Sequence, residues 1–231
     1  MSQSPRNRAS WFAKGAAAVV VALGALLILP GTAFAYNGGA AAQYADAYTQ
    51  TPNPQYTYFN GDDCTNFISQ AFRAGGFSMV NSPLNTYNPS PGDDHNWWDL
   101  TGAEQYTVYP QPATSHSAAV AQDLNTFLVV DNPGGISEGY FYYNNGNNRA
   151  PAYTPNAMVT GDVLFYDWTD DGDIDHASMQ VGIGTDQYGF YGNVVDSHTN
   201  PRYHVFWTLK PVNTQWKTTV VYFQHVAATN P

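Results

Sequence analysis

The sequence predicts an α+β domain in which the helices come first and an antiparallel sheet follows. Between residues 38 and 130, apolar residues recur at the three- and four-residue spacing of helices that bury one face. After residue 161 the apolar spacing changes to two, which is typical of strands. Helices followed by strands, without alternation, indicate an α+β arrangement.

Three helices are expected in the first half of the chain. Small residues from Gly38 to Thr49 predict the first helix, and the prolines that follow end it. The second begins at Cys64, with Asp62 or Asp63 as its cap, and ends at Gly75 and Gly76. Thr114–Val130 predicts the third, whereas the proline-rich stretch 77–112 is expected to be irregular.

The second half predicts the strands of the sheet. No element is assigned to the polar residues 136–157. The expected strands cover 162–166, 174–183, 193–198, 203–209 and 218–226. The last two of these strands are expected to pair as a hairpin across a turn at Asn213.

The first 35 residues predict a secretory signal peptide. Three basic residues precede an uncharged apolar run over 15–29, and Ala33-Phe34-Ala35 is typical of a cleavage site. We therefore expect a signal peptide over 1–35, a mature domain over 36–231 and an extracellular location. The alternative is a membrane-anchoring helix, but the apolar run is short for a span.

The charge of the mature domain excludes some partners. Residues 1–35 contain three of the eight basic residues and none of the eighteen acidic ones, so the mature chain has a net charge of −13. Such a surface repels nucleic acid and anionic membranes. We expect a monomer without stable membrane association after the signal is cleaved.

Cys64 is the only cysteine, so the chain has no intramolecular disulfide. It lies in the first turn of the second predicted helix, where free N–H groups and the helix dipole favour a thiolate. A thiolate at this place is the expected nucleophile of a cysteine hydrolase. The alternative is a buried structural thiol, since free cysteines are among the most buried residues.

His176 is the candidate base. In the strand predicted over 174–183, alternation places His176 opposite the face that carries Ala177, Met179 and Val181. A histidine that meets the start of a packed helix would form a Cys–His pair with Cys64. The alternative is an ordinary surface histidine.

Four motifs carry a resemblance to a known family. They are Gly-Asp-Asp-Cys-Thr-Asn-Phe-Ile-Ser-Gln (61–70), Gly-Asp-Val-Leu-Phe-Tyr-Asp-Trp (161–168), Asp-Gly-Asp-Ile-Asp-His-Ala (171–177) and Asp-Ser-His-Thr (196–199). In this order they resemble the bacterial putative amidase domain family, which is similar to papain-like cell-wall cysteine peptidases and amidases. The resemblance covers most of residues 40–210. It implies a papain-like fold, with Cys64 as nucleophile and His176 as base.

The resemblance also implies roles for nearby residues. His198 takes the place of the polar residue that orients the base, although alternation puts Asp196 on the same strand face and leaves it as a second candidate. Asp63 matches the acid before the nucleophile, with a structural role as helix cap. Trp97 and Trp98 are candidates for the substrate rim, although packing is the commoner role of such residues.

No cofactor or metal is expected. The acidic turn Asp167–Asp175 resembles a calcium loop, but position 12 of that loop would be Ser178 in place of a glutamate. A solvated Asp-Gly turn is the preferred interpretation. The Cys and His spacing does not indicate zinc.

The predicted function is a secreted cysteine amidohydrolase or peptidase that forms an acyl-enzyme at Cys64. By resemblance the substrate is a peptide, with peptidoglycan stem peptides as the expected class. One alternative is a transglutaminase-like acyl transferase that uses the same Cys–His chemistry. The other is a non-catalytic glycan- or wall-binding module in which Trp97, Trp98 and surface tyrosines form the binding face.

Overall fold

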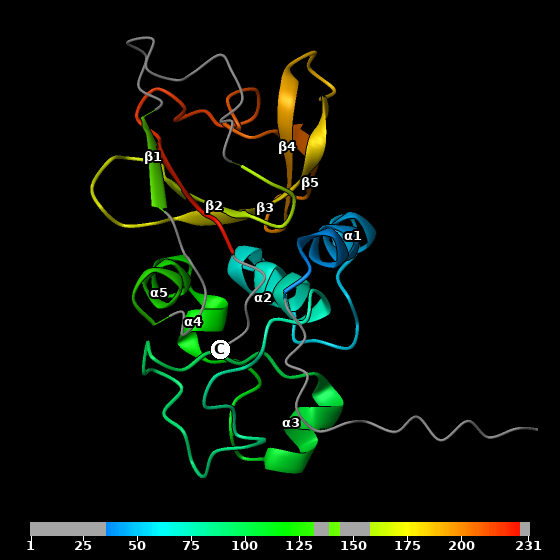
Figure 1. The fold of residues 1–231 in the computed structure, drawn as a ribbon, viewed down its shortest axis with the longest axis vertical. Helices are drawn as coiled ribbons and strands as arrows, with labels where there is room; N and C mark the ends of the chain where they lie inside the picture. The colour runs from blue at the N-terminus through cyan, green and yellow to red at the C-terminus, as the bar shows by residue number, and fades with distance from the viewer. Residues whose placement is uncertain (1–35, 132–138, 144–157, 227–231) are drawn as a thin grey trace, which may run out of the picture. The chain divides into compact units, whose positions relative to one another are not determined.

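The computed structural model describes residues 36–131, 139–143 and 158–226, all within one compact unit, Ala33–Pro231. Helices come first in this unit and strands follow, which confirms the α+β class (Figure 1). Across these ranges, every helix is too short or too polar to span a membrane.

The helices follow the predicted order, with two differences. Helix α1 (Gly38–Tyr48) and helix α2 (Cys64–Ala74) confirm the first two predictions. The expected helix over 114–130 is instead divided into α4 (His116–Ala119), α5 (Ala121–Thr126) and a π-helical turn (Phe127–Asp131). The helix is interrupted at Val120, whose backbone is extended.

The stretch 77–112 is not wholly irregular, because it contains helix α3 (Gly102–Val108). The Thr101 hydroxyl accepts the Glu104 N–H, and the Glu104 carboxylate accepts the Thr101 N–H. This reciprocal pair is a capping box, and its Thr-x-x-Glu pattern was visible in the sequence.

The sheet has six strands in the order β1-β6-β2-β3-β4-β5, and every described neighbour pair is antiparallel. The strands are β1 (Gly139–Tyr143), β2 (Val163–Asp167), β3 (His176–Thr185), β4 (Tyr191–Ser197), β5 (Arg202–Phe206) and β6 (Val220–Gln224). Strand β1 lies in the stretch for which no element was predicted.

The predicted hairpin between the last two strands is wrong. Strand β5 pairs with β4, whereas β6 lies between β1 and β2. Val220, Val221 and Phe223 of β6 are fully buried, so this strand needs covered faces and two neighbours. Strand β5 has half-exposed residues, as expected of a strand at the edge of the sheet.

The two faces of the sheet bury different sets of side chains. Phe165, Ala177 and Met179 pack against helices α1, α2 and α5 in one apolar core. Leu164, Tyr166, Val195, Val221 and Phe223 form a second core on the other face, together with Trp207 and Leu209. Helix α2 therefore lies along the first face, against β3 (Figure 1).

Candidate active site

Cys64 is the first residue of helix α2 and is nearly buried, at 5% exposure. Its Sγ lies 3.6 Å from the Thr65 hydroxyl and also makes a hydrogen bond with the backbone of Ala177. Because Ala177 follows His176 at the start of β3, the thiol lies where helix α2 meets this strand.

One pocket of about 280 Å³ is lined by both Cys64 and His176. Arg202, Trp168, Asp62 and Asp175 also line it. The rest of its wall is mostly polar and uncharged, with Thr199, Asn200, Asn213, Thr214 and Gln215. The pocket therefore favours a polar substrate beside a cysteine and a histidine.

Aromatic rings hold His176 in place. The Trp168 ring stacks on the imidazole, with centroids 5.5 Å apart and an interplanar angle of 25°. Tyr166 is the partner of His176 in the β2–β3 register, and the centroids of their two rings are 5.7 Å apart. The Tyr166 hydroxyl is itself fixed by Ser178 and by the carbonyl of Trp207, each at 2.8 Å.

Arg202, the first residue of β5, contacts His176 directly. One guanidinium nitrogen lies 3.1 Å from His176 Nε2. Because a guanidinium only donates hydrogen bonds, Nε2 must accept, and the proton of a neutral ring is then on Nδ1. Burial, followed by the charge of Arg202, lowers the pKa of His176 to about 3, so the ring is neutral at physiological pH.

The pKa of the Cys64 thiol differs in direction from the expectation for a helix N-terminus. Burial raises this pKa, and the nearby Asp62 charge adds to the effect. Hydrogen bonds from the Thr65 side chain and from the Ala177 backbone oppose the rise but are smaller. The resting site thus holds a neutral thiol beside a neutral imidazole, because burial outweighs the helix terminus.

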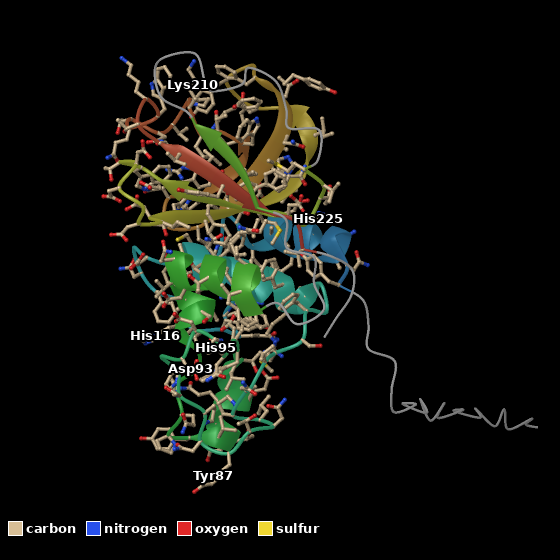
Figure 2. The ribbon with its side chains drawn as sticks, turned by 60° about the vertical axis from the view of Figure 1, so that its left-hand side comes forward. Tyr87, Asp93, His95, His116, Lys210 and His225 are labelled. Carbon is tan, nitrogen blue, oxygen red and sulfur yellow. The ribbon has the colours of Figure 1, made fainter. Side chains whose placement is uncertain are left out.

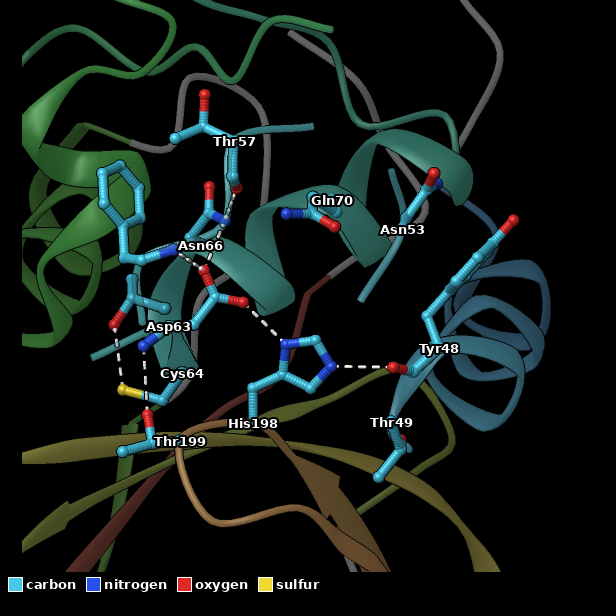
Figure 3. Close-up of polar contacts among 12 residues, drawn as sticks. Tyr48, Thr49, Asn53, Thr57, Asp63, Cys64, Asn66, Gln70, His198 and Thr199 are labelled. Atoms are coloured by element: carbon cyan, nitrogen blue, oxygen red, sulfur yellow. Dashed lines mark hydrogen bonds and ion pairs between the residues drawn. The ribbon is translucent and has the colours of Figure 1, made fainter. Parts of the chain in front are cut away.

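His198 lies elsewhere than the resemblance implied (Figure 3). Its Nδ1 is 2.6 Å from Asp63 Oδ2, and its Nε2 is 2.7 Å from the Tyr48 carbonyl. The ring also stacks on Phe67 with centroids 4.1 Å apart. Since both ring nitrogens are occupied, His198 does not hydrogen-bond to His176 and instead joins α1, α2 and the end of β4.

Strand register explains this placement. Asp196 pairs with Met179, so it shares the face of the sheet that meets the helices. His176 has the opposite orientation, because alternate residues of a strand point to opposite faces. The Asp196 carboxylate accepts hydrogen bonds from the Thr49 hydroxyl and from the His204 N–H, so it does not bond to the His176 ring either.

Asp63 occupies the N-cap position of α2 without capping a free N–H of the first turn. Its Oδ1 accepts the Phe59 N–H at 2.9 Å and the Asn66 amide at 2.8 Å, while Oδ2 meets His198. Asp63, the expected helix cap, therefore links the loop before Cys64 to helix α2 and to His198 at the end of β4.

Comparison with known proteins shows which family this arrangement belongs to. The family described as "Putative amidase domain" matches residues 35–223. The chain belongs to this amidase domain family. This confirms the resemblance carried by the cysteine and histidine motifs.

Two curated relatives come from Bacillus subtilis (strain 168), and both are described as uncharacterized proteins. YhbB is 30% identical over 151 residues, which is 65% of this chain and 39% of YhbB. YjcM is 55% identical over 40 residues, which is 17% of this chain and 10% of YjcM. The chain thus matches well under half of either relative. No solved structure matches it.

The expected substrate rim of this amidase domain is not at Trp97 and Trp98. Both side chains are fully buried, and Trp97 packs among Phe72, Phe77 and Phe127. Their burial also removes both tryptophans from the glycan-binding face of the alternative prediction. The tryptophan that lines the pocket is instead Trp168.

Sequence reasoning missed Trp168 and Arg202 as site residues. Trp168 ends the second motif of the amidase domain, so its place in that motif was the available signal. Arg202 is one of only five basic residues after residue 35 and follows the histidine motif closely. Four other histidines (95, 116, 204 and 225) do not line the pocket, and three of these are marked in Figure 2.

The acidic turn of the amidase domain uses its carboxylates internally. Asp167 accepts backbone N–H groups from residues 169–172, and Asp175 Oδ2 accepts the Trp168 N–H at 2.7 Å. Over the described ranges, the one group spaced to hold a metal ion is Asp46, Asp196 and His204, which lies outside the pocket.

Proposed function

We propose that this domain is a secreted cysteine amidohydrolase or peptidase with a papain-like arrangement, in which Cys64 is the nucleophile and His176 the base. The observation that carries the proposal is that both residues line one polar pocket, and that the Cys64 sulfur is hydrogen-bonded to the backbone of Ala177, the residue after His176. Membership of an amidase domain family supports amide bonds as the target.

The chemistry starts from the neutral pair. The Cys64 thiol proton moves to the ring nitrogen of His176 that bears the lone pair, as Sγ bonds to the carbonyl carbon of the amide. The carbonyl oxygen becomes an oxyanion, which the Cys64 N–H in the first turn of α2 stabilises. His176 then gives its proton to the leaving nitrogen as the carbon–nitrogen bond breaks, which leaves a thioester on Cys64.

Water completes the cycle. His176 takes a proton from a water molecule as the water oxygen bonds to the thioester carbon. The carbon–sulfur bond breaks, the acid leaves, and the proton on His176 returns to the Cys64 sulfur. The products are one amine and one carboxylic acid for each water consumed.

Peptides of the cell wall are the proposed substrate class, on the strength of the family resemblance and of the polar pocket wall. The signal peptide predicted over 1–35 supports secretion, and the predicted mature charge of −13 suits a freely diffusing monomer better than one held on an anionic wall.

The test is mass spectrometry of purified peptidoglycan and of peptide libraries after incubation with the mature protein. Cys64→Ala and His176→Ala should each lower kcat by about 10³-fold or more. His116→Ala removes an exposed histidine away from the pocket and should leave the rate unchanged. Activity that persists in Cys64→Ala would contradict the mechanism. An amide product in the presence of an added primary amine would indicate acyl transfer.

A further inference from the structure

The hydrogen bond from Arg202 to His176 has a chemical consequence for the base. A neutral imidazole has one ring nitrogen with a proton and one with a lone pair. In this structure the lone pair of Nε2 accepts from the Arg202 guanidinium at 3.1 Å. While this bond is made, the ring has no free lone pair for the Cys64 proton, whichever nitrogen faces the thiol.

The resting arrangement is therefore blocked. The ring holds its one proton on Nδ1 and its one lone pair against a cation that cannot accept a proton. The stacked Trp168 and the neighbouring Tyr166 restrict rotation of the ring. Catalysis needs Arg202 to release Nε2 before Cys64 loses its proton.

Arg202 is also suited to bind an anion. Of the residues that line the described pocket, it is the one with a permanent positive charge. Its described side-chain hydrogen bond goes to an uncharged ring, and no ion pair with a carboxylate is formed within the described part of the chain. Burial lowers the pKa of Arg202, which reflects a guanidinium that has lost water without gaining an anionic partner.

We propose that Arg202 binds a carboxylate of the substrate, and that this binding draws the guanidinium away from His176 and frees the base. The preferred substrates are then amides that carry a carboxylate beside the scissile bond, as acidic peptides do. This inference rests on the proposed function and names its substrate class. Arg202 thereby acts as a specificity-determining residue as well as a lock on His176.

The charge of the pocket favours a carboxylate over a phosphate group. A guanidinium forms two parallel hydrogen bonds with either group. Asp62 and Asp175 line the same pocket, and their negative charges repel a dianion more strongly than a monoanion. Exchange of the partner needs no proton transfer, because Arg202 stays protonated throughout.

The first experiment follows the His176 ring directly by ¹⁵N NMR in the wild-type protein, without turnover. The probes are N-acetylglutamic acid amide, which has one carboxylate, and N-acetylglutamine amide, its uncharged isostere. The carboxylate probe should shift the Nε2 signal of His176, and the uncharged probe should not. Equal shifts with both probes, or no shift with either, would overturn the proposal.

The second experiment measures alkylation of Cys64 by iodoacetamide at pH 7 in the free protein. Arg202→Gln frees the base, so the rate should rise by about tenfold or more. Lys210→Gln removes the same charge from an exposed residue outside the pocket and should leave the rate unchanged. Slower alkylation in Arg202→Gln would show that Arg202 stabilises the thiolate, which overturns the lock.

The third experiment compares peptides that differ by Glu against Gln beside the scissile amide. Wild-type kcat/KM should favour the Glu peptide by about tenfold or more, and Arg202→Gln should remove the preference by improving the Gln peptide. Arg202→Lys keeps the positive charge and should therefore keep part of the preference for the Glu peptide. Hydrolysis without preference would overturn this inference and leave the proposed function standing. A shift of the Nε2 signal with the carboxylate probe alone, without hydrolysis of any peptide, would support this inference and contradict the proposed function.

Discussion

Replacing His198 with alanine should destabilise the domain more than it slows catalysis. The ring is 2% exposed, and its two nitrogens bond to Asp63 and to the Tyr48 carbonyl at 2.6 and 2.7 Å. Truncation leaves the buried Asp63 carboxylate and the part-buried Tyr48 carbonyl without this donor, and it removes the ring stacked on Phe67. A buried polar group left unpaired costs about 1–3 kcal/mol, and a broken buried pair costs about 3–5 kcal/mol in all.

The measurement is thermal and urea unfolding of wild type and variant. For a domain of this size, a loss of about 3–5 kcal/mol lowers the midpoint temperature by roughly 6–20 °C. The control is His204→Asn, which breaks the pair of His204 with Asp46, in which both side chains are 40% exposed. Asparagine tolerates the positive φ of residue 204, so this loss should stay below about 1 kcal/mol.

One result would refute this reasoning. If His198→Ala unfolds with the wild-type midpoint while its kcat falls by tenfold or more, His198 acts on the base, as the family resemblance implied. Equal midpoints for the His198 and His204 variants would likewise show that the buried contacts contribute little. A lower midpoint, with kcat kept at low temperature, supports the structural role.

Three further predictions concern other buried groups. Neither carboxylate oxygen of Asp99 has a hydrogen-bond partner within the described residues, and burial raises the pKa of this group far above its usual value. The folded state therefore loses stability as pH rises above the unfolded pKa of about 4. Asp99→Asn should raise the free energy of unfolding by about 1–3 kcal/mol at pH 7 and by much less at pH 3. Equal gains at both pH values would contradict this prediction. Burial also raises the pKa of Cys64, so its alkylation in the free protein should rise at a higher pH than that of an exposed cysteine peptide, and a lower midpoint would indicate a resting thiolate. Trp97→Ala should cost about 3–5 kcal/mol of stability without a specific rise in KM, whereas Tyr87→Ala, at 99% exposure, should change the midpoint little.

The sequence predicted the parts of the site that depend on local geometry. The helix that starts at Cys64 follows from apolar spacing and from its terminal glycines, and the orientation of His176 follows from alternation along one strand. Both are properties of a single element. The structure adds that these two elements meet at one pocket.

The parts that were missed depend on contacts between distant elements. Arg202 reaches His176 because β4 and β5 form a hairpin that returns the chain to the start of β3, with an irregular register near Val195. Alternation showed that Asp196 and His198 share a face, but it did not show which face meets the helices, because that depends on the β3–β4 register. The expected hairpin of the last two strands failed for the same reason, since pairing of β6 with β1 and β2 is non-local.

For a domain with one cysteine that is proposed to act outside the cell, a neutral resting pair of Cys64 and His176 has a further advantage. The thiolate is the form of cysteine that oxidants and other thiols attack, so a low thiol pKa would expose Cys64 to damage outside the cell. Burial of the thiol and occupation of the His176 lone pair by Arg202 both keep the proton on sulfur until a substrate is bound. On the proposed function, the same contact that selects an acidic substrate then protects the nucleophile in its absence. Arg202→Gln should therefore make Cys64 more sensitive to hydrogen peroxide as well as to iodoacetamide. Equal sensitivity of wild type and variant to hydrogen peroxide would show that Arg202 does not protect the thiol from oxidation.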